Sequence, residues 1–553
     1  MDLIRPWVND GKLPAFRHIM GYGVSGDLQS TFPPVTAPAW TSFMTGKNPG
    51  KTDFFDFISH PDGGYEIRYA NASARKADSL WRILSDSGRK VGVINVPMTF
   101  PPEEVSGFFI SGMDTPDENS DFVRPREMRA ELERRFGKIR LDIRHLGHMR
   151  NDRIRDKVLK ELEELEDYRK CISLYLLEQY NPDVFMVVFN ATDQVQHHFL
   201  HYMDSRHPLF DSAGSKRYGD AVFRIYRKID ENLGEIMKAL PEDAAIIIMS
   251  DHGAGPVSRR HFFLNNFLQE IGVLAYKTGD QTKDQRQSLA WSFLKKVESF
   301  LKSRLSSRQK MLLARLFPGI RNKFESYLSL SLIDWGKTRA YSVEMLATSA
   351  NIWVNLQGKR PQGTVEEKDY EELITYIINK LLELRDPEGK QIVSKIYRKQ
   401  EIYNGPFLCN APDLVLDWWS GEGFLPRASL PHEQGNAISI KKDGVRGGQD
   451  WSGTHKINGI FMAGGYPFKK GFSLHDAKII DVAPTVLYLS GVPVPEDMDG
   501  RILTECIDDA FLNAHPVSFS KERKQGDSPA GRLDSAEEEE KIRERLRGLG
   551  YIS

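Results

Sequence analysis

Residues 244–256 read AAIIIMSDHGAGP, and this short stretch decides the fold class. An apolar run of strand length is followed directly by Asp251 and His252. Gly253 and Gly255 then let the backbone turn sharply. Open α/β sheets place their sites just beyond the carboxyl ends of their strands. The stretch therefore predicts a buried strand that ends at a functional site.

Similar apolar runs alternate with helical patterns along the chain. Helical periodicity is strong at 156–180 and 218–240, and a further helix is predicted at 481–492. This alternation is typical of an α/β fold with a mostly parallel central sheet flanked by helices. Buried strands are predicted at 90–96, 183–190, 244–250 and 458–464, and a small β-α-β unit at 340–420.

Changes in composition divide the chain into parts. We expect a catalytic core in two pieces, an inserted basic helical cap, a small α/β subdomain, and a polar tail with a terminal helix. The predicted bounds are 1–272 and 441–512 for the core, 273–335 for the cap, 336–440 for the subdomain and 513–553 for the tail.

The predicted cap is strongly basic. From Lys295 to Lys323 it carries nine Lys or Arg residues and one Glu, an excess of eight positive charges. One interpretation is a solvated helix packed on the core. The alternatives are a lid over an anionic substrate or a membrane-surface contact through 291–323.

Overall composition excludes several protein classes. The 553 residues carry a net charge of -1, which argues against a nucleic-acid polymer as partner. No apolar run is long enough to span a membrane, and residues 1–10 do not resemble a signal peptide. Cys171, Cys409 and Cys506 are few and far apart, so we expect a reducing, cytoplasmic location. The oligomeric state stays open.

One glycine motif is misleading. Gly21, Gly23 and Gly26 match G-x-G-x-x-G, the fingerprint of dinucleotide-binding folds. That fingerprint follows a strand and opens a helix. Here the segment before the glycines has a helical pattern and the one after them is extended, so we predict a helix end and not a cofactor site.

Two further segments place metal-ligating side chains near predicted strands. In FMVVFNATDQVQHHF (185–199), Asp193 and His197 lie four residues apart and so share one face of a helix. In WSGTHKINGIFMAGG (451–465), His455 precedes a strand. Each pattern alone has ordinary structural uses. With Asp251 and His252 they form a set of carboxylates and imidazoles that suits Zn²⁺ or a similar divalent ion.

The stretch TFPPVTAPAWTSFMTGKNPG (31–50) supplies a candidate nucleophile. Thr36 lies at the Pro-rich entry to a predicted helix that ends near Gly46. Thr36 could simply begin the helix, or it could be a nucleophile at a helix N-terminus, where backbone N–H groups favour an anion. Two ions about 4 Å apart could hold both the attacking and the leaving oxygen of a phosphoryl displacement.

Taken in order, these motifs resemble the alkaline phosphatase superfamily, most closely the type I phosphodiesterase/nucleotide pyrophosphatase branch and relatives described as phosphohydrolases or phosphomutases. The matching segments are TAPAWTSFMTGKNPG, ATDQVQH, SDHG, GTH and IIDVAPTVLYLSGVPVPEDMDGRIL, which span about residues 15–505. Sulfatases share the fold but have Cys or Ser at the nucleophile and Arg four residues later, where this chain has Thr36 and Trp40.

The resemblance implies a site built around two divalent ions, Zn²⁺ or alternatively Mn²⁺. It implies that Thr36 is the nucleophile and forms a phospho-threonine intermediate. One ion would be held by Asp193, His197 and His455, and the other by Asp251, His252 and the Thr36 oxygen. The implied function is hydrolysis of a small phosphorylated substrate, either a phosphodiester or a phosphomonoester.

The chain departs from the family pattern at its start. Family members begin with a buried strand that ends in Asp-Gly, and that Asp ligates the second metal. Met1 falls in what reads as the following helix, so we expect a truncated start. The alternative is a relative that has lost the strand and the ligand, with Asp53 or Asp56 as a substitute. Losing the strand would leave two neighbouring strand edges unpaired in a buried sheet.

Two other functions therefore remain open from the sequence. One is a catalytically impaired relative that binds phosphorylated ligands. The other is a phosphotransferase or mutase that uses the same site and differs in the acceptor.

Overall fold

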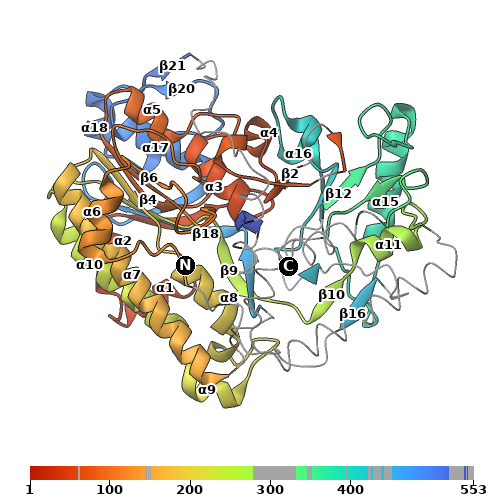
Figure 1. The fold of residues 1–553 in the computed structure, drawn as a ribbon, viewed down its shortest axis with the longest axis horizontal. Helices are drawn as coiled ribbons and strands as arrows, with labels where there is room; N and C mark the ends of the chain where they lie inside the picture. Colours follow the sequence, from red (N-terminus) through yellow and green to blue (C-terminus); the bar gives the residue numbers. More distant parts are fainter. Residues whose placement is uncertain are drawn as a thin grey trace.

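The described part of the computed structural model contains three four-stranded sheets, and two of them form a core with helices packed around it (Figure 1). Within the described part of the chain, no helix is long and apolar enough to cross a membrane. The structure describes residues 1–553 except 60–62, 66, 144–145, 147–148, 150, 278–329, 331, 345–350, 394, 421–424, 427–436, 441–450, 522–540, 544 and 546–553.

The first sheet has the strand order β6–β5–β4–β7. Every residue of its strand β4 (Val91–Val96) is buried. β4 pairs in parallel with β5 (Gly107–Ser111) on one edge and with β7 (Val184–Val187) on the other. β6 (Val123–Arg124) adds antiparallel to β5. A continuous apolar run such as that of β4 suits a strand covered on both faces.

The second sheet has the order β19–β1–β18–β8. β18 (Asn458–Gly464) runs antiparallel to β1 (Val24–Gln29) and to β8 (Ile246–Met249). β19 (Phe472–Lys478) extends the sheet parallel to β1. Strands far apart in the sequence therefore meet in one sheet.

A cavity of about 1330 Å³ is lined by both β7 and β8. Among the described strands, β7 pairs only with β4 and β8 only with β18. We call this cavity the inter-sheet slot.

Helices cover both faces of the sheets. α7 (Asp152–Tyr180), α10 (Ala221–Ala239) and α8 (Ala191–Met203) pack together on one side, and α3 (Thr36–Thr45) and α17 (Val482–Leu489) pack together on the other (Figure 1). α7 begins where the Asn151 side chain accepts the Ile154 N–H, a typical N-cap.

The small subdomain holds a third sheet, with order β11–β12–β14–β13, on the right in Figure 1. Its strands β11 (Ala340–Tyr341), β12 (Asn351–Val354), β14 (Leu414–Leu416) and β13 (Ile396–Arg398) all pair antiparallel. α15 (Tyr370–Glu383) lies between β12 and β13 in the chain. The strand–helix–strand pattern predicted at 340–420 is therefore present.

The glycine motif lies at the end of a helix and the start of a strand, as predicted from the sequence. Gly21 is inside α2 (Pro14–Tyr22), Gly23 ends that helix, and Gly26 lies in β1. A helix followed by a strand is the reverse of the dinucleotide fingerprint. A Cβ at position 26 would lie 2.2 Å from the Leu474 carbonyl oxygen, so glycine here serves the pairing of β1 with β19.

The predicted core elements are confirmed, whereas the cap cannot be compared. Strands at 90–96, 183–190, 244–250 and 458–464 correspond to β4, β7, β8 and β18. Most of 273–335, including all of 291–323, lies outside the described residues, as does most of 522–553. The predicted domain bounds stay predictions.

The remaining helices and strands are α1 (Ile4–Asn9), α4 (Pro49–Thr52), α5 (Leu80–Asp86), α6 (Met128–Phe136), α9 (Ser212–Tyr218), α11 (Leu264–Glu270), α16 (Lys399–Ile402), α18 (Asp509–Ala514), β2 (Ile58–Ser59), β3 (Arg68–Tyr69), β9 (Gly253–Pro256), β10 (Arg260–Phe262), β15 (Leu425–Pro426), β16 (Ile438–Ile440), β17 (Gly453–Lys456), β20 (Val494–Pro495) and β21 (Phe519–Ser520).

Candidate active site

Two strand ends deliver the acidic side chains of the site. β7 leads into the first turn of α8, which carries Asp193, and β8 leads directly to Asp251. The Ser30 hydroxyl, just after β1, donates to the backbone carbonyl of Asp251 at 2.5 Å and fixes the turn there. The carboxyl ends of β7 and β8 thus bring both carboxylates to one end of the inter-sheet slot.

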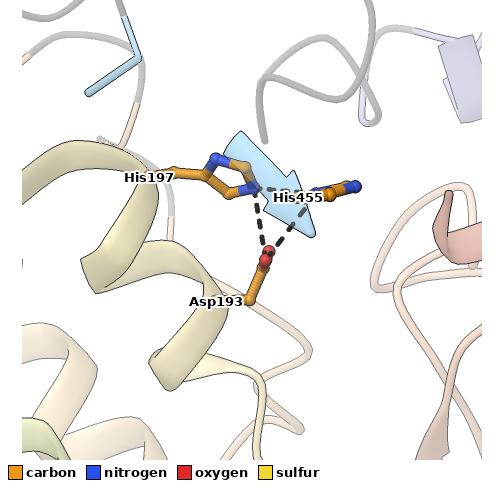
Figure 2. Close-up of side chains that lie close together, drawn as sticks. All are labelled: Asp193, His197 and His455. Carbon is orange, nitrogen blue, oxygen red and sulfur yellow. Dashed lines mark hydrogen bonds and ion pairs between the residues drawn. The ribbon is translucent and has the colours of Figure 1, made fainter. Parts of the chain in front are cut away.

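Asp193, His197 and His455 form a tight group, in which one ligand atom from each lies within 4.8 Å of the others. Figure 2 shows the two imidazoles and the carboxylate pointing toward one another. The Nε2 atoms of the histidines are 3.1 Å apart, and the Asp193 Oδ1 lies 3.2 Å from His197 Nε2 and 3.9 Å from His455 Nε2. His455 comes from β17, which pairs with β9 rather than simply preceding a strand.

Asp251 and His252 adjoin this group. His252 Nε2 lies 3.3 Å from Asp251 Oδ2 and 4.0 Å from Asp193 Oδ1. The ring of His252 stacks on that of His455, with centroids 3.7 Å apart. The five predicted side chains, separated by up to 262 positions in the sequence (193 to 455), therefore gather in one place.

Each of the three imidazole rings is oriented by a contact with a backbone carbonyl. The Nδ1 atoms of His197, His455 and His252 contact the carbonyl oxygens of Gly453, Pro34 and Gly253 at 2.9, 2.9 and 3.0 Å. A hydrogen bond at Nδ1 places the proton there and leaves Nε2 as an electron-pair donor. All three Nε2 atoms face Asp193, so the group has the donor chemistry and the orientation of a divalent-metal site.

The charges of the group depend on one another. Burial favours the neutral carboxyl of Asp193, but the nearby His197, His252 and His455 outweigh it and lower its pKa. Burial also favours neutral His197, but Asp193 raises the pKa of this imidazole above its usual value. Burial, with His252 and His197 nearby, lowers the pKa of His455 well below 6.5. Burial raises the pKa of Asp251.

Thr36 is the first residue of α3 and lines the same cavity as Asp193, Asp251 and His252. Its side chain is buried. Pro34, two residues earlier, is the residue whose carbonyl contacts His455 Nδ1, so the Pro-rich entry to α3 is tied directly to the ligand group.

Asp53 and Asp56, the two residues considered as substitutes for the family's N-terminal metal ligand, form other contacts. Asp53 accepts a hydrogen bond from Asn410, and Asp56 accepts the N–H of Phe57. Among the described residues, neither belongs to the group of possible metal ligands. The hypothesis that one of them replaces a ligand gains no support from this geometry.

Sequence reasoning missed one aromatic residue at the site. The Trp451 ring lies against that of His197, with centroids 3.8 Å apart. The available signal was its position four residues before His455, in the WSGTH stretch. The contact depends on how the segment folds back on α8, and spacing alone does not show that.

Solved structures of low sequence identity resemble the chain. Phosphonoacetate hydrolase from Sinorhizobium meliloti, in complex with phosphonoformate, has a TM-score of 0.50 and 14% identity, with 86% of this chain and 89% of that chain covered. Human ectonucleotide pyrophosphatase/phosphodiesterase 5 has a TM-score of 0.47 and 13% identity, with 90% and 95% covered. An inactive murine form of the latter, in complex with AMP, has a TM-score of 0.43 and 13% identity, with 87% and 90% covered.

Sequence comparison identifies the family. No curated protein matches the chain significantly. The family model for type I phosphodiesterase/nucleotide pyrophosphatase matches residues 1–427, which include α3, β7, α8 and β8 with their candidate site residues. The chain therefore belongs to the type I phosphodiesterase/nucleotide pyrophosphatase family of phosphoric ester hydrolases.

Proposed function

We propose that the protein hydrolyses small phosphoric esters with two divalent ions and with Thr36 as the nucleophile. The observation that carries the proposal is the convergence of three Nε2 atoms on the Asp193 carboxylate, beside a helix N-terminus that begins with Thr36. Packing alone does not require three imidazole nitrogen atoms to be directed at one carboxylate, whereas metal binding does.

We assign ligands to each ion as the family resemblance implies. Asp193, His197 and His455 would hold the first, and Asp251, His252 and the Thr36 hydroxyl would hold the second. Imidazole and carboxylate suit Zn²⁺, with Mn²⁺ as the alternative. When bound, such ions supply Lewis-acid stabilisation of negative charge on phosphoryl oxygens.

The chain's own groups carry the remaining steps. Thr36 Oγ1 forms a bond to phosphorus as the bond from phosphorus to the leaving ester oxygen breaks. The Thr36 hydroxyl gives its proton to solvent, the leaving oxygen takes up a proton from solvent, and the enzyme holds a phospho-threonine. Water then attacks the phosphorus, the Thr36 hydroxyl is restored, and the phosphorylated product departs.

The N-terminus of α3 favours the anionic group at this position. The N–H groups of Thr36 and Ala37 lie in the first turn, where no intrahelical carbonyl is available to accept them. Pro38 has no N–H to satisfy. Two donors and the positive end of the helix dipole therefore support a phosphoryl group held beside Thr36.

We further propose a cytoplasmic location. Cys171, Cys409 and Cys506 are all free thiols, and Cys171 and Cys409 are exposed. Exposed free thiols suit a reducing compartment. Separation of cell fractions followed by immunodetection tests the location, and recovery of the protein outside the cytosolic fraction contradicts it.

The test is a panel of 4-nitrophenyl phosphate, bis(4-nitrophenyl) phosphate and phosphonoacetate with Zn²⁺ or Mn²⁺. Phosphonoacetate is included because a phosphonate hydrolase is among the similar structures. We expect turnover of a phosphate ester, and we expect Thr36→Ala to lower kcat by at least roughly 10³-fold because the nucleophile is gone. Thr36→Ser should retain part of the activity because it keeps a hydroxyl.

Thr41→Ala is the matched control. It removes a hydroxyl from the same helix, and the Thr41 Oγ1 has no hydrogen-bond partner within the described structure. Full activity of Thr36→Ala would contradict the proposed nucleophile. Turnover in ¹⁸O-labelled water distinguishes hydrolysis from transfer, because transfer leaves the product unlabelled. Metal binding without any turnover would favour the ligand-binding relative.

A further inference from the structure

We propose that Glu166 and Arg169, a buried ion pair on α7, are positioning residues for the first metal ion: they fix the first turn of α8 and with it the Asp193 carboxylate. The proposal rests on the proposed function, because it requires that the group of Asp193, His197 and His455 holds an ion. It goes beyond that function by assigning a role to two residues outside the ligand group.

Glu166 and Arg169 lie three positions apart on α7, and both side chains are buried. Arg169 Nη1 lies 2.9 Å from each of the two Glu166 carboxylate oxygens. Removing two charges from water is costly, and replacing a buried ion pair by apolar side chains is often neutral or stabilising. The stability of the fold therefore does not by itself explain this pair, and its further contacts show another role.

The Glu166 carboxylate caps the start of a neighbouring helix. Its Oε1 accepts the N–H of Ala191, the first residue of α8, at 2.7 Å. The N–H groups in the first turn of a helix have no intrahelical acceptor, and the helix dipole favours a carboxylate there. Asn190, the residue at the N-cap position, makes no side-chain cap of its own. A side chain of α7 therefore supplies a cap for α8.

Arg169 contacts the residue that precedes Ala191. Its Nη1 donates to the Asn190 side-chain oxygen at 2.5 Å, and its Nη2 donates to the backbone carbonyl of Leu141 at 2.8 Å. A guanidinium presents its donors in a rigid planar fork, so these contacts fix both the place and the orientation of Asn190. The ion pair therefore binds two consecutive residues at the point where the chain leaves β7 and enters α8.

Asp193 follows this fixed point by two residues and lies in the first turn of α8. Its Oδ1 is 3.9 Å from the Nε2 of His455, which comes from β17 and not from α8. One ion has to reach both atoms, and metal–ligand distances in proteins hold to within about 0.2 Å. A small shift of the first turn of α8 would therefore disturb the geometry that the first ion requires.

His197, one turn later on α8, is held by a different segment. Its Nδ1 contacts the Gly453 carbonyl at 2.9 Å, and its own carbonyl accepts the N–H of Ser452 at 2.6 Å. The second turn of α8 is therefore bound to the segment that carries His455, whereas the first turn is bound to α7. Loss of the α7 contacts should displace Asp193 more than His197.

The experiment compares Arg169→Lys with the wild-type full chain and measures Zn²⁺ binding by chelator competition. Lysine keeps the positive charge beside Glu166 but lacks the planar fork that reaches both Asn190 and Leu141. We expect the affinity of the first ion to fall by about tenfold, as for other groups that hold metal ligands in place. The affinity of the second ion should not change, because its proposed ligands lie on other segments.

A second readout separates positioning from stability. One equivalent of Co²⁺ is added in place of Zn²⁺, because the visible absorption of bound Co²⁺ depends on its coordination geometry. Arg169→Lys should change this absorption spectrum. Thermal unfolding of the metal-free variant is measured in parallel, and the spectra are recorded well below its midpoint, so that a change in absorption reports the site and not unfolded protein.

Arg224→Lys is the matched control. Arg224 pairs at 2.8 Å with Glu163, which is also on α7, but it belongs to α10 and not to α8. The same substitution there should leave both affinities and the Co²⁺ spectrum unchanged. Asn190→Ala decides the matter if Arg169→Lys does not fold. It removes the contact between α8 and Arg169 but keeps the ion pair, and it should also weaken the first ion.

Four outcomes would overturn the proposal. Unchanged affinity of the first ion in both Arg169→Lys and Asn190→Ala would show that the pair only packs α7 on α8. Equal weakening of both ions would show a general effect on the fold, as would the same loss in Arg224→Lys. A wild-type chain that binds no ion would contradict both this proposal and the proposed function. Ion binding without ester turnover would contradict the proposed function alone.

Discussion

The two groups of proposed metal ligands are assembled in different ways. Asp193, His197 and His455 place three ligand atoms within 4.8 Å of one another, and backbone carbonyls orient both imidazoles. The second group has the consecutive residues Asp251 and His252 and, in the proposed assignment, would take its third donor from Thr36. The first group brings three side-chain ligand atoms close together, and the second group brings two from adjacent residues. We therefore expect the first ion to bind more tightly than the second.

The largest effect should come from removing the carboxylate that faces every histidine. Asp193→Asn should lower kcat/KM by on the order of 10³-fold and abolish binding of the first ion, because a bound ion supplies several kcal/mol of charge stabilisation. Asp251→Asn should lose only the second ion. Metal analysis after gel filtration, together with ester turnover, measures both effects.

Asp142→Asn is a suitable control. Asp142 accepts a hydrogen bond from Gln194, which lies next to Asp193 on α8, and it is outside the ligand group. Retention of the first ion by Asp193→Asn, or its loss in Asp251→Asn, would contradict this assignment of the two groups.

A smaller effect is expected from pH on the first ion. In the metal-free protein the pKa of His197 is raised, whereas that of His455 is lowered well below 6.5. A metal must displace the proton of His197, so affinity should fall as pH falls through the raised pKa and level off above it. His455 is already neutral in that window and releases no proton.

Calorimetry in buffers of different ionisation enthalpy, from pH 6 to 8.5, measures the affinity and the number of protons released. At most about a tenfold change per pH unit is expected, since a single proton is displaced. Release of two protons per ion near pH 7 would show that His455 also titrates there. An affinity independent of pH would remove His197 from the ligand group.

The smallest effect concerns Trp451, which supports the first group only. Its ring packs against His197 and helps to fix the imidazole. Trp451→Ala should weaken binding of the first ion by about tenfold, the lower end for residues that orient ligands. Trp451→Phe keeps an aromatic ring and should retain most of the affinity.

Chelator competition measures the affinity of both ions in each variant. Equal weakening of both ions would mean that Trp451 acts on the site as a whole and not on His197. An effect of Trp451→Phe as large as that of Trp451→Ala would exclude simple ring packing.

Much of the core could be predicted from the sequence because its signals are local. Continuous apolar runs gave β4, β7, β8 and β18, and a period of 3.6 residues gave α7 and α10. The pairing of these strands could not be predicted, because β7 and β4 have similarly apolar sequences. Only the fold shows that, among the described strands, β4 pairs with two neighbours and β7 with one.

Part of the candidate site could likewise be predicted from local spacing, and part of it could not. The spacing of Asp193 and His197 predicts a shared helix face, and Asp251 with His252 directly after a strand predicts a turn at the sheet edge. The approach of His455, the carbonyl contacts that orient the imidazoles, and the packing of Trp451 on His197 had no local signal. Apart from the contact of His252 with the neighbouring Gly253 carbonyl, these contacts join segments more than 200 residues apart in the chain.

By itself, the sequence determined the residue types of the site, the helices and strands that carry them, and the family to which the chain belongs. The tertiary structure alone decided which donor atoms meet and which of the described strands pair with one another. The physical reason is that periodicity and spacing act over a few residues, whereas metal-ligand geometry and strand pairing depend on contacts between distant segments, which form only when the core packs.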